Sequence, residues 1–117
     1  MTEPYVVVIM PAFKSKDHII DVLARVPEIV SKVIVVDDAC PEETGKIVQA
    51  EVKDKRVEVI FNEKNLGVGG AVIVGLRKAL EADFDIAVKI DSDGQMNPED
   101  ISRLIQPIID SEADYSK

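Results

Sequence analysis

A run of four β-branched residues, Val33-Ile34-Val35-Val36, leads directly into two adjacent carboxylates, Asp37 and Asp38. An uninterrupted run of this kind is typical of a strand covered on both faces, as in a parallel sheet flanked by helices. Parallel α/β sheets bind their ligands beyond the carboxyl ends of the strands, which is where these two carboxylates would lie. The stretch therefore predicts both the type of sheet and the edge that would carry a functional site.

The rest of the chain alternates strand-like and helix-like segments. Short apolar runs predict further strands at 5–10, 57–61 and 86–90, and a segment of helical periodicity follows each strand. Repeated strand–helix–strand units with short connections require a parallel sheet with right-handed crossovers. The expected fold is therefore α/β, with three α/β/α layers around a mostly parallel sheet.

Capping residues and prolines predict where the helices begin. Asp17 is the expected cap of the first helix, and Pro41 is expected in the first turn of the second. Asn97 and Pro98 are expected to open the last helix, and Tyr115 to begin another strand. Each polar cluster then follows a strand, so we expect the clusters to converge on one edge of the sheet.

The composition suits a single domain and excludes several classes of protein. The chain has 117 residues and a formal net charge of −8, which disfavours binding to a nucleic-acid backbone. No apolar run approaches the ~20 residues that span a bilayer. The N-terminal apolar segment lacks a preceding basic region, so we expect no secretory signal. The single cysteine, Cys40, fits the reducing conditions of the cytoplasm.

The segment Asp91-Ser92-Asp93-Gly94-Gln95 carries the most specific chemistry. Two carboxylates at i and i+2 at the end of a strand can point to the same side, and a divalent cation would relieve their repulsion. Hard oxygen ligands suit Mg²⁺ or Mn²⁺, which keep positions open for phosphate oxygens, and Gln95 offers a further neutral oxygen. The alternative is a pair of solvated loop aspartates beside an ordinary Asp-Gly turn.

Other polar residues at the same predicted edge have two interpretations each. Asp37 and Asp38 can accept hydrogen bonds from a nucleotide base or ribose, or can supply negative charge at the start of the next helix. Lys64 can contact a phosphate or remain a solvated surface lysine. The glycine-rich segment 65–70 matches neither a dinucleotide fingerprint nor a Walker motif, and its glycines are expected to allow a tight turn and close helix packing.

Taken together, three segments resemble a known family. Residues 34–41 (IVVDDACP), 65–71 (NLGVGGA) and 91–101 (DSDGQMNPEDI) follow the order and spacing of family 2 glycosyltransferases, and look closest to the dolichyl- or polyprenyl-phosphate mannose or glucose synthases. The resemblance covers essentially the whole chain. It implies a GT-A fold, with residues 1–117 as its Rossmann-like, nucleotide-diphospho-sugar-binding half.

The resemblance also implies a function and a set of site residues. A hexose would pass from a UDP- or GDP-sugar to a polyprenyl or dolichyl phosphate, with Mg²⁺ or Mn²⁺ on the diphosphate. Asp91 and Asp93 would form the D-x-D motif that holds the ion, with Gln95 as an additional ligand. The residues expected at the nucleotide are Pro11, Ala12, Phe13, Ser15, Val36, Asp37, Asp38, Lys64, Gly67, Asp91, Ser92 and Asp93.

The chain departs from the family pattern in two respects. Ser15 stands where the family usually has a glutamate, and the acceptor-binding part of the family would follow residue 117. No catalytic base is therefore predicted, and membrane association is expected only of a longer protein. An exposed sheet edge and an uncovered apolar surface would lead the 117-residue chain to self-associate.

Two other functions are compatible with parts of this pattern. A receiver-like phosphoacceptor domain has a similar length, a doubly wound sheet and clustered aspartates. However, it keeps its acidic pair after the first strand, where this chain has Pro11-Ala12-Phe13. The second alternative is a truncated domain that binds a nucleotide but transfers nothing.

Overall fold

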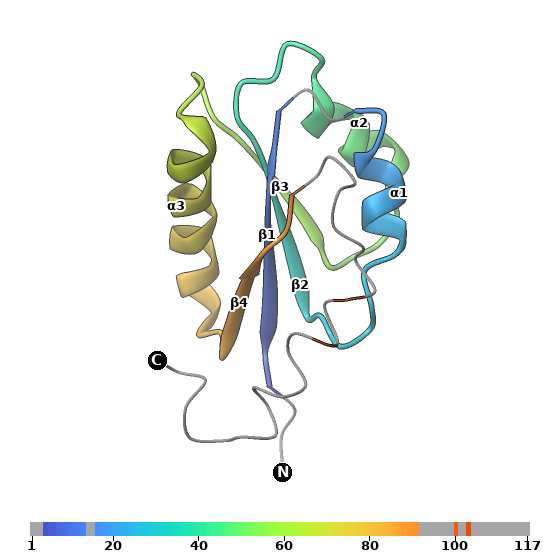
Figure 1. Ribbon diagram of the computed structural model, residues 1–117, viewed down its shortest axis with the longest axis vertical. Helices are drawn as coiled ribbons and strands as arrows, with labels where there is room; N and C mark the ends of the chain where they lie inside the picture. Colours follow the sequence, from blue (N-terminus) through green and yellow to red (C-terminus); the bar gives the residue numbers. More distant parts are fainter. Residues whose placement is uncertain (1–3, 14–15, 92–99, 101–102, 104–117) are drawn as a thin grey trace.

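A computed structural model of the chain describes residues 4–13, 16–91, 100 and 103. Its central feature is a sheet in which every described strand runs parallel to its neighbours. The strands are β1 (Val6–Ala12), β2 (Lys32–Asp37), β3 (Val57–Phe61) and β4 (Ile86–Lys89). Their order is β3-β2-β1-β4, which leaves β3 and β4 at the two edges of the described sheet (Figure 1).

Helices cover both faces of this sheet. On one face lie α1 (Ile19–Ala24) and α2 (Thr44–Glu51), and on the other lies α3 (Gly67–Ala79), which continues into the 3-10 turn η1 (Leu80–Ala82) (Figure 1). The predicted three-layer α/β/α arrangement is confirmed. Within the described ranges, no helix has the length and apolar character needed to cross a lipid bilayer.

The strand order argues against the receiver-like alternative. Receiver-type sheets follow the order 2-1-3-4-5, in which the third strand lies beside the first. Here β3 pairs with β2, and β1 pairs with β4. This is the start of the other doubly wound order, 3-2-1-4, in which a crevice forms at the carboxyl edge where the direction of winding reverses.

The core lies on both faces of β1. Val6, Val8 and Met10 are fully buried toward α1 and α2, whereas Val7 and Ile9 are buried toward α3. Successive side chains of a strand point to opposite faces, so this two-sided burial confirms that a continuous apolar run predicts a covered strand.

The first strand is longer than predicted, because it continues through Pro11 and Ala12. Proline lacks an amide hydrogen and normally disrupts a central strand. In β1 the hydrogen-bonding groups of Ile9 point toward β4. Those of Pro11, two residues further on, point to the same side. The ladder to β4 ends at Ile9, where the Ile90 amide donates to the Ile9 carbonyl over 3.0 Å. Among the described residues, the pairing of β1 with β4 therefore ends before the position at which a Pro11 amide hydrogen would be needed.

Two predicted helix starts were wrong. The N-cap of α1 is His18 rather than Asp17, and its side chain makes no capping hydrogen bond. Pro41 precedes α2 instead of occupying its first turn, because α2 begins at Thr44. The intervening residues are held in a turn by hydrogen bonds that are described below. The helix predicted at Asn97 and Pro98 and the strand predicted at Tyr115 lie outside the described residues.

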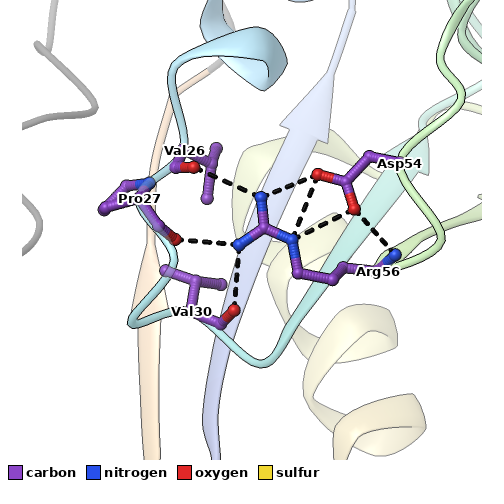
Figure 2. A network of polar contacts seen from close by, with 5 residues as sticks. All are labelled: Val26, Pro27, Val30, Asp54 and Arg56. Carbon is purple, nitrogen blue, oxygen red and sulfur yellow. Dashed lines mark hydrogen bonds and ion pairs between the residues drawn. The ribbon is translucent and has the colours of Figure 1, made fainter.

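An arginine ties together two turns at the opposite, amino-terminal edge of the sheet. Figure 2 shows the Arg56 guanidinium donating to the carbonyls of Val26 (3.2 Å), Pro27 (2.8 Å) and Val30 (2.9 Å). It also forms an ion pair with Asp54, with 2.7 Å between Nη2 and Oδ2. This contact lowers the pKa of Asp54 and raises that of Arg56. The segment before β3 is thereby fixed to the segment between α1 and β2.

We expect Arg56→Ala to lower the free energy of unfolding by about 2 kcal/mol, because three partly buried carbonyls and a carboxylate lose their donor together. Urea denaturation measures the change. Lys46→Ala is the matched control: its ion pair with Glu43 is exposed and 3.6 Å long, so the loss should stay within about 0.5 kcal/mol.

The same comparison depends on pH. The hydrogen bond from Arg56 lowers the pKa of Asp54 below its ordinary 3.8 in the folded chain. The resulting stabilisation is present above that value and is lost as the pH falls through the lowered, folded-state pKa. The difference between wild type and Arg56→Ala should therefore shrink below about pH 4. A difference that grows on acidification would contradict this interpretation.

Candidate functional site

The ends of β1, β2 and β3 are joined by backbone hydrogen bonds at the carboxyl edge of the sheet. The Asp38 amide donates to the Ala12 carbonyl (3.1 Å), and the Asn62 amide donates to the Asp37 carbonyl (2.9 Å). Three segments that are far apart in the sequence, one apolar (residues 11–13) and two polar, therefore lie side by side. This confirms for these three segments that the clusters converge on one edge.

The carboxylate of Asp37 holds the turn that leads into α2. Asp37 is only 3% exposed, and its Oδ1 and Oδ2 accept hydrogen bonds from the amides of Cys40 (2.8 Å) and Gly45 (2.7 Å). A Cβ at position 45 would lie 2.8 Å from Asp37 Oδ2 and 2.6 Å from Cε1 of Phe61. Only glycine leaves room for this close approach, so Gly45 and Asp37 together set the start of α2 at Thr44.

Asp38 performs the corresponding role for α3. Its Oδ1 accepts from Asn62 Nδ2 (2.9 Å) and from the Leu66 amide (2.8 Å), and its Oδ2 accepts from the Gly67 amide (2.9 Å). Leu66 is the N-cap of α3 and its side chain makes no capping hydrogen bond. A carboxylate from the neighbouring strand therefore binds the first free amides of the helix, where negative charge is favourable.

The two interpretations of the acidic pair can now be compared with the geometry. Both side chains are bound to backbone amides at or before a helix start, as the helix-terminus interpretation predicts. Asp38 accepts three hydrogen bonds from described residues and, like Asp37, is only 3% exposed, so the described geometry supports the helix-terminus interpretation for both. Asn62 and Asn65 were not among the predicted site residues, although both lie in the segment that directly follows a predicted strand. The side-chain amide of Asn65 donates to the Asp38 carbonyl (3.3 Å).

The remaining residues predicted at the nucleotide fall into three groups. Phe13, Lys64 and Gly67 are exposed at the carboxyl edge, and Gly67 has a left-handed backbone with φ of 80°. Ala12 and Val36 are fully buried, so their side chains belong to the core rather than to a surface that a ligand can reach, while Pro11 is partly buried. Ser15 and Ser92 lie outside the described residues.

Of the three predicted metal ligands, the structure describes one. Asp91 follows Ile90 at the end of β4, is half-exposed, and lies 3.0 Å from Lys89 Nζ through its Oδ1. Asp93 and Gln95 lie outside the described residues. Among the described residues, no three or more His, Cys, Asp and Glu side chains are grouped so that they could hold a metal ion.

A parallel sheet of order 3-2-1-4 defines a domain of the doubly wound α/β class, which binds its ligands at the carboxyl edge of the sheet. Residues 7–116 match the family model described as glycosyl transferase family 2. The chain belongs to this family, as the three motifs indicated.

Its relatives include enzymes named for lipid-phosphate acceptors. The UDP-N-acetylglucosamine–dolichyl-phosphate N-acetylglucosaminyltransferase of Methanococcus voltae is 36% identical over 98% of this chain and 51% of its own length. The undecaprenyl-phosphate mannosyltransferase of Micrococcus luteus is 35% identical over 88% of this chain and 44% of its own length. The chain thus spans about half the length of these relatives.

Solved structures of glycosyltransferases share the fold. S. aureus TarS 1–349 in complex with UDP-GlcNAc has a TM-score of 0.72 and 26% identity, over 92% of this chain and 31% of that one. The mannosyltransferase PcManGT of Pyrobaculum calidifontis, in complex with GDP-Man and Mn²⁺, has a TM-score of 0.71 and 25% identity, over 86% of this chain and 30% of that one. The predicted GT-A fold is confirmed.

We expect Asp38→Asn to destabilise the start of α3. An asparagine keeps one acceptor oxygen but turns an amide group toward other N–H donors, which should cost about 1–2 kcal/mol. Hydrogen exchange at the amides of Leu66 and Gly67 should become faster. Asp21→Asn, on the exposed surface of α1, is the control and should leave the free energy of unfolding and the exchange of these two amides unchanged. Unchanged exchange at Leu66 and Gly67 in Asp38→Asn would contradict the capping role.

Proposed function

We propose that this chain is the nucleotide-diphospho-sugar-binding half of a glycosyltransferase that transfers a hexose from a UDP- or GDP-sugar to a polyprenyl or dolichyl phosphate. The observation that carries the proposal is the convergence of the Asp37–Asp38 segment and the glycine-rich start of α3 on the carboxyl edge of a sheet of this order. The family membership and the names of the relatives supply the reaction type and the acceptor class.

The nucleotide would lie over the ends of β1, β2 and β3. Phe13 is 43% exposed beyond β1 and offers an apolar surface to a base. In our proposal a base N–H or a ribose hydroxyl donates to the carboxylate of Asp38. A Cβ added at Gly67 or Gly69 would have no atom of the other described residues within 4 Å. A phosphate can therefore approach the first turn of α3 closely.

Asp91 is the one described residue of the proposed metal site, and carboxylate oxygens suit a hard divalent cation. Asp91 presents a half-exposed carboxylate that already attracts a cationic group, the ammonium of Lys89. In our proposal Asp91, Asp93 and Gln95 hold Mg²⁺ or Mn²⁺ through oxygen atoms, as in the D-x-D motif. The mannosyltransferase of Pyrobaculum calidifontis, whose fold is similar, is described with Mn²⁺.

Each side chain then has a defined part in the reaction. A bound divalent ion supplies positive charge that stabilises the nucleoside diphosphate as it leaves the anomeric carbon. Asp91 and Asp93 hold and orient that charge and transfer no proton. Asp38 accepts hydrogen bonds from the amides of Leu66 and Gly67 and so keeps the start of α3 in place.

We expect Asp93→Ala and Asp91→Ala to abolish the part of UDP or GDP binding that depends on Mn²⁺, since each removes a charged ligand. Isothermal titration calorimetry with and without Mn²⁺ measures the effect, which should exceed tenfold in Kd. Glu51→Ala, at the exposed carboxyl end of α2, is the control and should bind as wild type does. Unchanged nucleotide binding in Asp93→Ala would refute the role of the pair.

A nucleotide-binding chain without transfer activity is the second candidate, because the chain spans only about half the length of its relatives. A transfer assay with a radiolabelled UDP- or GDP-hexose and a polyprenyl phosphate separates the two candidates. Product formed by the 117-residue chain supports the transferase, and nucleotide binding without product supports the second candidate.

We also propose that the chain self-associates through apolar side chains on α3 and η1. Val68, Ile73 and Leu80 are each more than half exposed, and β4 lies at an edge of the described sheet. Analytical ultracentrifugation should show dimers or larger species, and Ile73→Lys should shift them toward monomer. A wild-type chain that sediments as a monomer from micromolar to millimolar concentration would exclude this proposal.

A further inference from the structure

Lys89 and Asp91 lie on the same side of β4, at the carboxyl edge. Side chains of a strand alternate between faces, and Ile90 between them is fully buried toward α1 and α2. Ala87, two residues before Lys89, packs on the other face, toward α3. Lys89 and Asp91 lie on the same side as Ala87. The Nζ of Lys89 is 3.0 Å from the Oδ1 of Asp91, and their side chains are 43% and 50% exposed, respectively.

This ion pair contributes little to the fold. By contrast, Lys32 on β2 and Lys78 on α3 both pair with Glu58 on β3, and so connect these three elements. Lys89 instead pairs with a residue two positions along its own chain, and connects no two elements of the fold. Exposed pairs of this kind stabilise a protein only weakly. A lysine at the end of an otherwise apolar strand therefore needs another explanation.

We propose that Lys89 is a built-in competitor of the divalent cation at Asp91. Its ammonium occupies the carboxylate in the metal-free protein and has to leave it when the ion binds. This inference rests on the proposed metal role of Asp91. Lys89 is a positioning residue here: it acts through Asp91 and does not itself hold the ion.

Two physical effects give Lys89 this influence. The ion must break the contact between the ammonium and the carboxylate, and once bound it is repelled by the nearby positive charge of Lys89 in a largely aqueous environment. Screening by salt reduces both effects at an exposed site. Together they should weaken the binding of a free divalent cation by about three- to tenfold.

A nucleotide changes this balance. Its diphosphate brings negative charge that offsets the repulsion between the ion and Lys89. The penalty should therefore be largest for the metal alone and smaller for the metal that arrives together with a nucleotide. Lys89 would thus favour loading of the metal–nucleotide complex over loading of the free ion.

The test is Mn²⁺ binding, followed by electron paramagnetic resonance of the free ion, in wild type, Lys89→Gln and Lys89→Met. Both variants remove the charge and should bind Mn²⁺ alone about three- to tenfold more tightly than wild type, with a smaller change when UDP or GDP is present. The difference should shrink as ionic strength rises. Lys89→Arg keeps the charge and should stay close to wild type, as should Lys46→Met on the exposed surface of α2.

The outcomes separate this inference from the proposed function. If Asp91→Ala abolishes Mn²⁺ binding but Lys89→Gln and Lys89→Met bind Mn²⁺ as wild type does or more weakly, the competition is wrong and the metal role of Asp91 stands. If Asp91→Ala leaves Mn²⁺ binding unchanged, the metal role and the competition both fail. Circular dichroism of each variant confirms that the comparison is made between folded proteins.

Discussion

The carboxylates of Asp37 and Asp38 hold the functional edge of this domain together. Both are only 3% exposed, and between them they accept hydrogen bonds from four backbone amides and the side chain of Asn62. Buried carboxylates are costly unless they are paired or hydrogen-bonded, so their position requires these donors. The donors come from the starts of α2 and α3 and the turns before them, which fixes both helices relative to the end of β2. Hydrogen bonds within the chain therefore hold the start of α3, where our proposal places the diphosphate.

A second constraint sets the position of Asp91. Alternation along β4 places Ile90 in the core and leaves its neighbours Lys89 and Asp91 on the opposite side. The burial of one isoleucine therefore determines where the first carboxylate of the D-x-D segment points. At the other end of the sheet, Arg56 fixes the turns that precede β2 and β3. The strands that carry the site are held at both ends.

Most of the fold followed from local sequence patterns. Continuous β-branched runs predicted β1 and β2, because burial on both faces leaves no polar alternation. The edge strands β3 and β4 were predicted from short apolar runs that each include one charged residue, Glu58 or Lys89. The start of α2 could not be predicted from Pro41, because it depends on contacts of Asp37 with residues up to eight positions away and on the fit of Gly45 against Phe61. The role of Asp38 at α3 also depends on a contact across 29 positions, between two segments that only the folded sheet brings together. Sequence patterns indicated that these residues matter, but long-range hydrogen bonds determine what they do.

In the proposed function a divalent cation and a nucleotide bind together at the carboxyl edge of this sheet. Amide NMR of the chain with UDP or GDP, before and after addition of Mn²⁺, tests it directly, because the paramagnetic ion broadens signals only from nearby nuclei. The structure predicts nucleotide-dependent broadening at Asp91 and around the start of α3, with the signals of Asp54 and Arg56 at the opposite edge left sharp. Broadening at Asp54 and Arg56, or none that depends on the nucleotide, would contradict the claim.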